Sequence, residues 1–315
     1  MKFENKFIII LIASIAIYAI FLFASDYNKI LDKDFNFNLS YILPILSLVT
    51  ISWIPLILKW HLLLKENDIH VPFKKNILIW LSGSALNTTP GQLGGLIKAQ
   101  LIKTLYGIPR TRTAPIVLVE KFYGLVGAII AAIIGIIISG TNFNLALFGF
   151  GVLGLLFFFI YYRPVFEFLF NKMTKLKFFS KRSENISGSY KILQISTKPK
   201  IASICIGLSL SYWIIISFSV YLVLLAFEIN TISFIQTLSI YTSSVIIGVV
   251  SLIPGGIGVT EGSLVGLFTF EGIDISLALV LSVIIRLTTL WYSVSIGFIG
   301  LKLTGGLSLS RDLKK

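Results

Sequence analysis

The sequence predicts an all-α polytopic membrane protein with about six full transmembrane helices and two re-entrant broken-helix hairpins in an inverted repeat. Three observations predict this fold. The chain of 315 residues is 56% hydrophobic and only 13% charged, which is more apolar surface than a soluble fold would cover. Its basic residues flank the apolar runs. Two polar breaks, each with a Pro-Gly pair, interrupt otherwise apolar stretches.

Six apolar segments approach or exceed the roughly 20 residues that a helix needs to cross the hydrocarbon core. The first segment has a basic start and a long apolar part. We interpret it as an uncleaved helix and not as a signal peptide, because further spans follow it. The six segments are residues 7–24, 41–63, 112–139, 143–161, 200–227 and 275–302.

Two further segments, 73–106 and 232–271, each consist of an apolar arm, a polar break and a second apolar arm. A Pro-Gly pair stops a helix because proline lacks an N–H and glycine gains little from helical order. The arms have roughly 13–20 residues, and most are short for a full crossing at about 1.5 Å per residue. We expect two re-entrant hairpins; two full crossings per segment is the alternative.

The basic residues predict which side of the membrane each loop occupies. With a cytoplasmic N-terminus, the cytoplasmic segments hold 23 of the 27 lysines and arginines, as the positive-inside rule requires. We therefore expect a multi-pass protein of the cell membrane with both termini in the cytoplasm. The net charge of +13 follows from these flanks, so nucleic acid is not an expected partner. The cytoplasmic segments are 1–6, 59–75, 98–112, 162–200 and 302–315.

Residues 1–315 are expected to form a single integral membrane domain with repeat halves at about 41–139 and 200–303. Three crossings separate the two hairpins, so the hairpins enter from opposite sides. Inverted repeats of this kind place binding sites near the middle of the membrane. The loop 162–200 mixes lysines with phenylalanines, which suits either a segment lying on anionic headgroups or an ordinary basic loop.

The two breaks are candidate ligand-binding segments. A helix that restarts after a break has unsatisfied N–H groups and a positive end that suits an anion. Glycines let the backbone approach a ligand closely, although close helix packing would also require them. The candidate residues are Pro90, Gly91, Gln92, Gly94 and Gly95 in the first break and Pro254, Gly255, Gly256 and Gly258 in the second.

Charged side chains within apolar segments are further candidates, since each costs roughly 2.5–3.5 kcal/mol to insert. Stripes of small residues turn Glu120 and Arg286 into the bundle, at equivalent places in the two halves. Two roles stay open: ion pairs Glu120–Arg286 and Lys98–Glu261 that lock the repeats together, or a polar cavity that these residues line. For Lys121, lining the cavity and snorkelling to the cytoplasmic interface are both open.

The motifs resemble the flippase-like membrane family related to the lysylphosphatidylglycerol synthase transmembrane domain, which is the N-terminal domain of the multiple peptide resistance factors. The likeness covers about residues 7–303 and implies two re-entrant segments and a role in moving lipids between leaflets. This sequence ends at Lys315 with no aminoacyl-transfer domain, so lysine transfer is not carried over. The motifs are Thr89–Gly95 with Lys98, Val119–Lys121 and Ser251–Glu261.

We expect a flippase or scramblase that translocates an anionic phospholipid or phosphoryl-linked lipid between leaflets. The sequence contains no recognisable catalytic, metal or nucleotide motif, so we predict neither enzyme activity nor a cofactor. The alternatives are an intramembrane lipid-modifying or glycosyl-transferring enzyme and a non-catalytic partner of a lipid synthase. The expected partners are membrane lipids, anionic ones above all; a homo-oligomer and a separate lipid or glycan synthase stay open.

Overall fold

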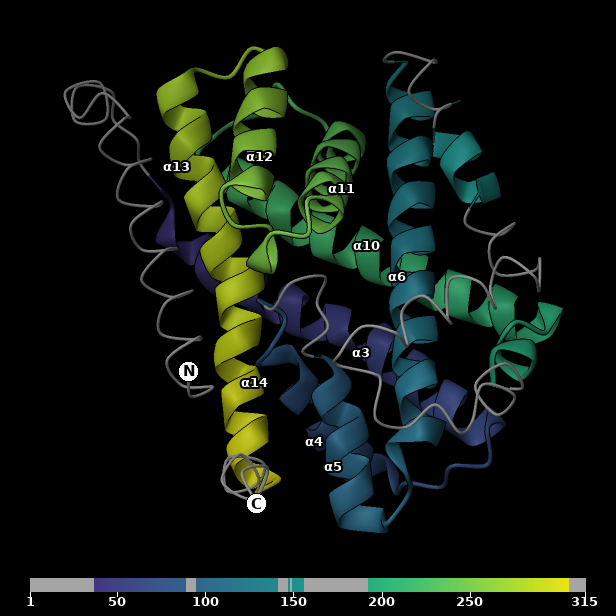
Figure 1. The fold of residues 1–315 in the computed structure, drawn as a ribbon. Coiled ribbons are helices and arrows are strands. Elements are labelled where there is room, and N and C mark those ends of the chain that lie inside the picture. Colours follow the sequence, from purple (N-terminus) through teal and green to yellow (C-terminus); the bar gives the residue numbers. More distant parts are fainter. Residues whose placement is uncertain (1–36, 89–94, 141–146, 148, 156–191, 306–315) are drawn as a thin grey trace.

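The structure is a computed structural model, and its described residues form helices joined by short turns (Figure 1). The predicted span 7–24 lies outside the described residues, as does most of 143–161 and most of the basic loop 162–200. Residues 89–94 of the first break also lie outside them. The described residues are 37–88, 95–140, 147, 149–155 and 192–305.

Four helices in this described part are long and apolar enough to cross a membrane, and they confirm four of the predicted spans. Proline 199 starts one of them at a position where its missing N–H costs nothing, and Gly140 ends another with φ 70°. The last span contains a π-helical segment directly after Arg286. These helices are α3 Ile42–Glu66, α6 Arg110–Ser139, α10 Pro199–Ala226, and the continuous run of α13 Ile275–Arg286, η4 Leu287–Trp291 and α14 Tyr292–Leu303.

Shorter helices form the arms of the two broken segments. At about 1.5 Å per residue, even the longest, with 17 residues, falls short of a hydrocarbon core about 30 Å thick. In the second break Leu252, Gly255, Gly256 and Gly258 all have positive φ, so the backbone reverses through left-handed conformations. The arms are α4 Phe73–Ser84 and α5 Ile97–Tyr106 in the first segment, and α11 Phe234–Val250 and α12 Val259–Phe270 in the second, with η3 Pro254–Gly256 between α11 and α12.

The two pairs of short helices lie at opposite ends of the long helices (Figure 1). The pair α4–α5 lies beside the start of α6 and the end of α14, whereas α11–α12 lies beside the end of α6 and the start of α13. Helix α4 packs on α14, and α11 makes the corresponding contact with α6. The two halves therefore make corresponding helix contacts at opposite ends of the molecule.

Small residues allow these contacts, as the stripes in the sequence predict. A Cβ on Gly135 of α6 would lie 2.6 Å from the Cβ of Ser239 in α11, and a Cβ on Gly297 of α14 would overlap the backbone of Ala85 beside α4. Gly127 makes a similarly close contact with Ser209 of α10. Glycine is needed at these points because a side chain would force the helices apart.

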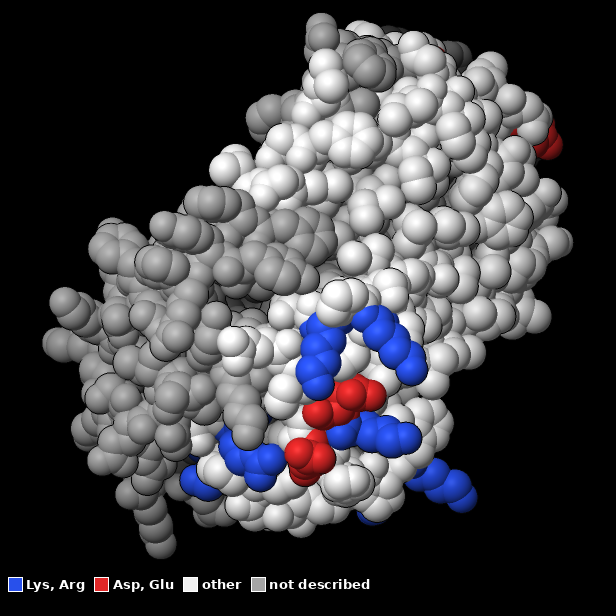
Figure 2. All heavy atoms as spheres, turned by 90° about the vertical axis from the view of Figure 1, so that its right-hand side faces the viewer, with Lys and Arg blue, Asp and Glu red and all other residues white. Residues whose placement is uncertain are grey.

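The exposed lysines and arginines of the described part gather at one end of the molecule, where the exposed Glu66 and Asp68 also lie. In the described part, exposed lysines and arginines flank the ends of α3, α5 and α14 and the starts of α4, α6 and α10. At the other end, the exposed charges of the described part are the acidic Glu228 after α10 and Asp274 before α13. Figure 2 shows one face of the molecule, with charged side chains gathered at its lower end below a broad uncharged surface. An apolar belt between polar ends is the surface that a bilayer requires.

Candidate functional site

A cavity of about 440 Å³ lies where the two broken segments approach each other. Its walls come from α3, α4, α5, α6, α10, α11, α12 and the helix that carries Arg286. A Cβ on Gly255 would lie 3.4 Å from the Cα of Thr88, so the second break contacts the last described residue before the gap in the first. Gly255 thus serves a close backbone approach between the two halves, whereas Gly256 approaches Gly248 and Thr260 within the second half.

The structure brings most of the predicted site residues that it describes to this cavity. Gly258 and Glu261 lie behind its wall, and Pro254 also does not line it. Pro90, Gly91, Gln92 and Gly94 fall outside the described residues. The predicted residues that line the cavity are Gly95, Lys98, Glu120, Lys121, Gly255, Gly256 and Arg286.

Positive charges converge on one carboxylate in the first half of the chain. Lys98 of α5 forms an ion pair with Glu120 of α6, and its ammonium lies 4.2 Å from the centre of the Trp60 ring. The indole N–H of Trp80 donates to the other Glu120 oxygen at 3.1 Å. Lys121 of the same helix lies near Lys98, because the Cβ position of Gly95 is 3.4 Å from the Lys121 Cε and 4.0 Å from the Lys98 Cε. A buried ion pair needs such added hydrogen bonds to offset its desolvation.

Lys59 joins this cluster, although the sequence places it at the start of the cytoplasmic segment 59–75. It is 1% exposed in the interior of α3, and its ammonium donates to the Ser209 hydroxyl at 2.8 Å. Lys59 lines the cavity together with Lys98 and Lys121. The sequence holds one signal for it: Ser52 precedes it by seven residues, which is two helical turns on the same face.

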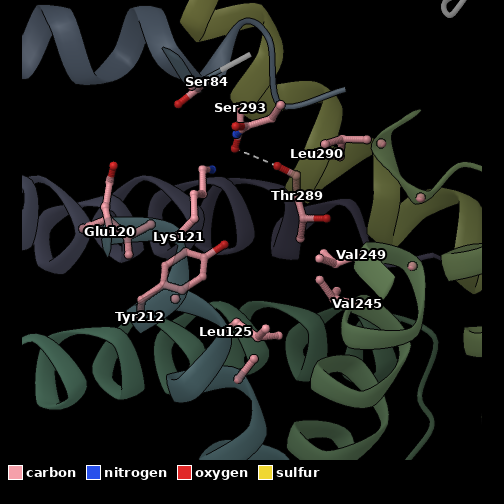
Figure 3. Close-up of a pocket in the computed structure, with 18 of the residues that line it drawn as sticks. Ser84, Glu120, Lys121, Leu125, Tyr212, Val245, Val249, Thr289, Leu290 and Ser293 are labelled. Carbon is pink, nitrogen blue, oxygen red and sulfur yellow. Dashed lines mark hydrogen bonds between the residues drawn. The ribbon is translucent and has the colours of Figure 1, made fainter. Parts of the chain in front are cut away.

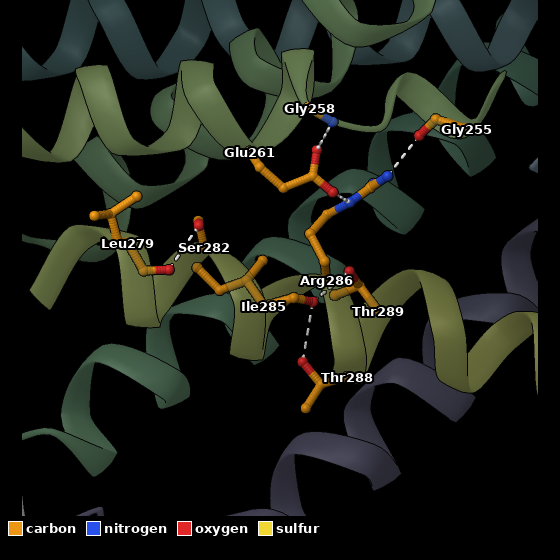
Figure 4. A network of polar contacts seen from close by, with 9 residues as sticks. All are labelled: Gly255, Gly258, Glu261, Leu279, Ser282, Ile285, Arg286, Thr288 and Thr289. Carbon is orange, nitrogen blue, oxygen red and sulfur yellow. Dashed lines mark hydrogen bonds and ion pairs between the residues drawn. The ribbon is translucent and has the colours of Figure 1, made fainter. Parts of the chain in front are cut away.

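The charged residues of the second half form a closed network (Figure 4). Arg286 donates through Nε to Glu261 at 2.8 Å and through Nη2 to the carbonyl of Gly255. The other Glu261 oxygen accepts the backbone N–H of Gly258 at 2.8 Å, at the start of α12. This carboxylate is completely buried and itself occupies the positive helix end that we expected to attract a ligand.

The alternative of ion pairs between the halves, Glu120–Arg286 and Lys98–Glu261, is wrong. Each pair forms within one half, between the second arm of a broken segment and the long helix that follows it. The signs are exchanged: the arm carries the cation in Lys98–Glu120 and the anion in Glu261–Arg286. Pairing within a half is favoured because α5 packs on α6 and α12 packs on α13.

The remaining wall of the cavity is aromatic and apolar. Trp213 donates its indole N–H to the carbonyl of Gly124 at 2.9 Å, and its ring contacts those of Tyr212 and Tyr241. Figure 3 shows Lys121, Tyr212 and Thr289 extending toward a common space. The described residues contain no group of three or more His, Cys, Asp or Glu side chains that would hold a metal ion. The cavity thus combines ammonium groups with apolar surface, as an amphipathic anion requires.

Comparison with known proteins identifies the family. A UPF0104 membrane protein of Methanothermobacter thermautotrophicus is 34% identical over 92 residues, which cover 29% of this chain and 27% of that protein. A second UPF0104 membrane protein of this organism is 28% identical over 92 residues, with the same coverage. Each match therefore spans about a quarter of the length of the curated relative. The family model described as lysylphosphatidylglycerol synthase TM region matches residues 11–297, so the chain belongs to this family of membrane proteins.

Proposed function

We propose that this protein is a flippase or scramblase that moves an anionic phospholipid or another phosphoryl-linked lipid between leaflets through the cavity between the two broken segments. The observation that carries the proposal is the cluster of buried Lys59, buried Lys98 and half-buried Lys121 near Glu120 in a cavity of about 440 Å³. Ammonium groups bind phosphate oxygens, and the aromatic and apolar wall suits the adjoining part of a lipid.

In this proposal the segments 73–106 and 232–271 are re-entrant hairpins of an inverted repeat. The lengths of their arms and their positions at opposite ends of the long helices support this arrangement. Halves related in this way carry a substrate by alternating which side of a central site is open. The exposed basic residues would mark the cytoplasmic side, with both termini there and the protein in the cell membrane.

The chemistry of the site favours transport of the lipid without a catalysed reaction. The carboxylates nearest the cavity, Glu120 and Glu261, are each paired with a cation and lie in different halves. A general acid and base need to face one reacting group, and this arrangement does not provide it. The substrate lipid would thus leave chemically unchanged, moving down its gradient or with an ion.

Reconstitution in vesicles tests this function. Vesicles of phosphatidylcholine with 10% fluorescent phosphatidylglycerol would be treated with a membrane-impermeant quencher, and the loss of inner-leaflet fluorescence would be followed. Val249→Trp would place a large ring in the cavity, whereas Ile247→Trp would place it on the exposed face of the same helix. We expect the first variant to slow lipid movement at least about ten-fold and the second to keep it within about two-fold.

Two outcomes would overturn the proposal. Wild-type protein that moves lipid no faster than empty vesicles would exclude translocation. Equal rates for both tryptophan variants would exclude this cavity as the route. Repeating the assay with and without a pH gradient tests coupling to protons, and identical rates would exclude that coupling. Mass spectrometry of the recovered lipids tests the enzyme alternative, which requires a new lipid species.

A further inference from the structure

Three neutral polar side chains line the cavity without a hydrogen bond to any described residue. They are the Ser84 hydroxyl of α4, the Asn87 amide just after α4 and the Tyr212 hydroxyl of α10. Figure 3 shows the hydroxyls of Ser84 and Tyr212 turned toward the space that the lining residues enclose. Ser84 is only 6% exposed. Buried polar groups nearly always have a hydrogen-bond partner, so these groups are available to a ligand.

Other helix hydroxyls nearby bond to their own backbone instead. Ser82 donates to the Leu78 carbonyl at 2.7 Å. Ser293, which also lines the cavity, donates to the Thr289 carbonyl at 2.7 Å. A serine within a helix commonly bonds to the preceding turn in this way. The Ser84 hydroxyl makes no such bond within the described part of the chain, so both its donor and its acceptor can serve a ligand.

These neutral groups lie next to ammonium groups of the same cavity. A Cβ built on the glycine before Ser84 would lie 3.0 Å from the Lys98 Cδ, so the end of α4 packs on the Lys98 side chain. Tyr212 lies about one turn of α10 after Ser209, which accepts a hydrogen bond from Lys59. An anion held by these lysines therefore has neutral hydrogen-bonding groups close to it.

The hydrogen-bonding character of these groups indicates the ligand chemistry. A hydroxyl and an amide each donate and accept, so a ligand hydroxyl, which also does both, is their match. A phosphate oxygen without a proton only accepts. A ligand ammonium only donates, and it would add a cation beside Lys59 and Lys98. The adjacent rings of Trp53 and Trp80, with centres 6.5 Å apart, offer apolar faces to the C–H groups that link ligand hydroxyls.

The cavity has room for a headgroup larger than a phosphate. Its volume of about 440 Å³ falls in the range of about 300–1,000 Å³ that small-molecule sites occupy. Val245 and Val249 of α11 line the same cavity and suit the apolar part of a lipid (Figure 3). One enclosure thus offers cations, neutral hydrogen-bonding groups and apolar surface.

We propose that the preferred ligand of the cavity is a lipid whose phosphoryl headgroup carries a polyol. The phosphoryl oxygens accept from the ammonium groups of Lys59 and Lys98. The polyol hydroxyls bond to Ser84, Asn87 and Tyr212. This inference rests on the proposed lipid-handling function and adds the headgroup class and the neutral residues that recognise it.

Competition binding to the purified full-length protein in detergent tests the polyol. The competitors are phosphatidylglycerol and phosphatidylpropanol with identical acyl chains, each measured against a fluorescent phosphatidylglycerol. The two lipids have the same charge and the same number of headgroup carbons, and they differ only in the headgroup hydroxyls. We expect phosphatidylglycerol to bind about ten-fold more tightly, which is the effect of about two neutral hydrogen bonds. Equal affinities would overturn the polyol preference.

A soluble competitor separates a lipid site from a site for a free polyol phosphate. Glycerol phosphate carries the same kind of headgroup without acyl chains, so it should not compete at the concentration at which phosphatidylglycerol does. Competition by glycerol phosphate as strong as that by the lipid would overturn the lipid assignment.

Hydroxyl deletions assign the preference to the lining residues. Tyr212→Phe and Ser84→Ala each remove one hydroxyl, and each should reduce the preference to about three-fold while phosphatidylpropanol binds as before. Tyr221→Phe is the matched control, because Tyr221 is half-buried in the same helix but packs against Phe218 and Phe234 and does not line the cavity. A preference that survives both single variants would overturn the inference.

The vesicle assay separates failure of this inference from failure of the proposed function. Phosphatidylpropanol that crosses as fast as phosphatidylglycerol, with equal binding, would leave lipid translocation intact and exclude the polyol preference. Preferential phosphatidylglycerol binding with no lipid crossing would leave the headgroup assignment intact and exclude translocation.

Discussion

The Glu261–Arg286 pair provides a quantitative test of the idea that the second half is a structural lock. Arg286→Met removes the hydrogen bond to a carboxylate that is completely buried, and it also removes the donor to the Gly255 carbonyl. A hydrogen bond to a charged group contributes about 1.5–3 kcal/mol, and an orphaned carbonyl costs about 1–3 kcal/mol. The variant should therefore lose about 3–5 kcal/mol of unfolding free energy, as is usual when one partner of a buried ion pair is removed.

A double-mutant cycle isolates the interaction from the loss of side-chain packing. Glu261→Gln together with Arg286→Met replaces both charges, so neither is left buried alone. The double variant should be less destabilised than the sum of the single variants by at least about 1.5 kcal/mol. Unfolding of the detergent-solubilised protein by guanidinium, followed by far-ultraviolet circular dichroism, gives the four free energies.

Additive effects in this cycle would refute the reasoning, because they would show that the two side chains do not stabilise each other. If the Glu261–Arg286 pair serves only to hold the helices together, the double variant, once folded, should still move lipid in vesicles. Loss of transport by a stably folded double variant would instead place Arg286 in direct contact with the lipid.

Three further predictions follow from local contacts. Gly297→Ala should lose about 1–3 kcal/mol of stability, because its Cβ would overlap the Ala85 backbone, whereas Gly262→Ala in α12 meets no atom within 4 Å and should be neutral or slightly stabilising in the same denaturation experiment. Ser233→Ala removes the capping box of α11 and should cost about 1 kcal/mol, and an unchanged midpoint would contradict it. A membrane-impermeant maleimide applied to intact cells should label Asn230→Cys and not Lys65→Cys, with the buried Cys205 of the unaltered chain as the unreactive control; the reverse pattern would show the opposite orientation.

The long helices were predictable because their signal is local. An apolar run as long as residues 112–139 is expected to form one helix that crosses the hydrocarbon core. In the structure this helix is only slightly longer, Arg110–Ser139. The small-residue stripes were predictable for the same reason, because Gly135 and Gly297 lie at helical spacing from the charges Glu120 and Arg286. Both features can be predicted from local sequence alone, because they depend only on the length of an apolar run and on the period of a helix.

The pairing of the charges was not predictable in the same way. Helical spacing shows which way Glu120 and Arg286 face, but two cations and two anions at similar depth permit more than one pairing. The choice depends on which helices pack together, and here α5 on α6 and α12 on α13 decide it. The distance along the chain was the available guide, because Lys98 and Glu120 are joined by one short turn at Gly107–Pro109.

Lys59 was missed for a related reason. It lies near the end of an apolar run and shortly before Lys65, so it resembles the basic flank that the positive-inside rule expects. Its burial follows from the packing of α3 against α10, where Ser209 receives its ammonium. Within α3 the one signal that separates a lysine facing α10 from a lysine facing the headgroups is Ser52, two helical turns earlier on the same face.

The two halves of this protein share an arrangement of helices but differ in the charged residues that they place at the cavity. Each half joins a broken-segment arm to its long helix through one ion pair, and alone these pairs would make both halves neutral. Lys59 and Lys121 break that equivalence, because no cation stands in addition to Arg286 among the described lining residues of the second half. In the proposed function, a repeated scaffold presents a central site to either side, while the ammonium groups of the first half hold the anion during the exchange.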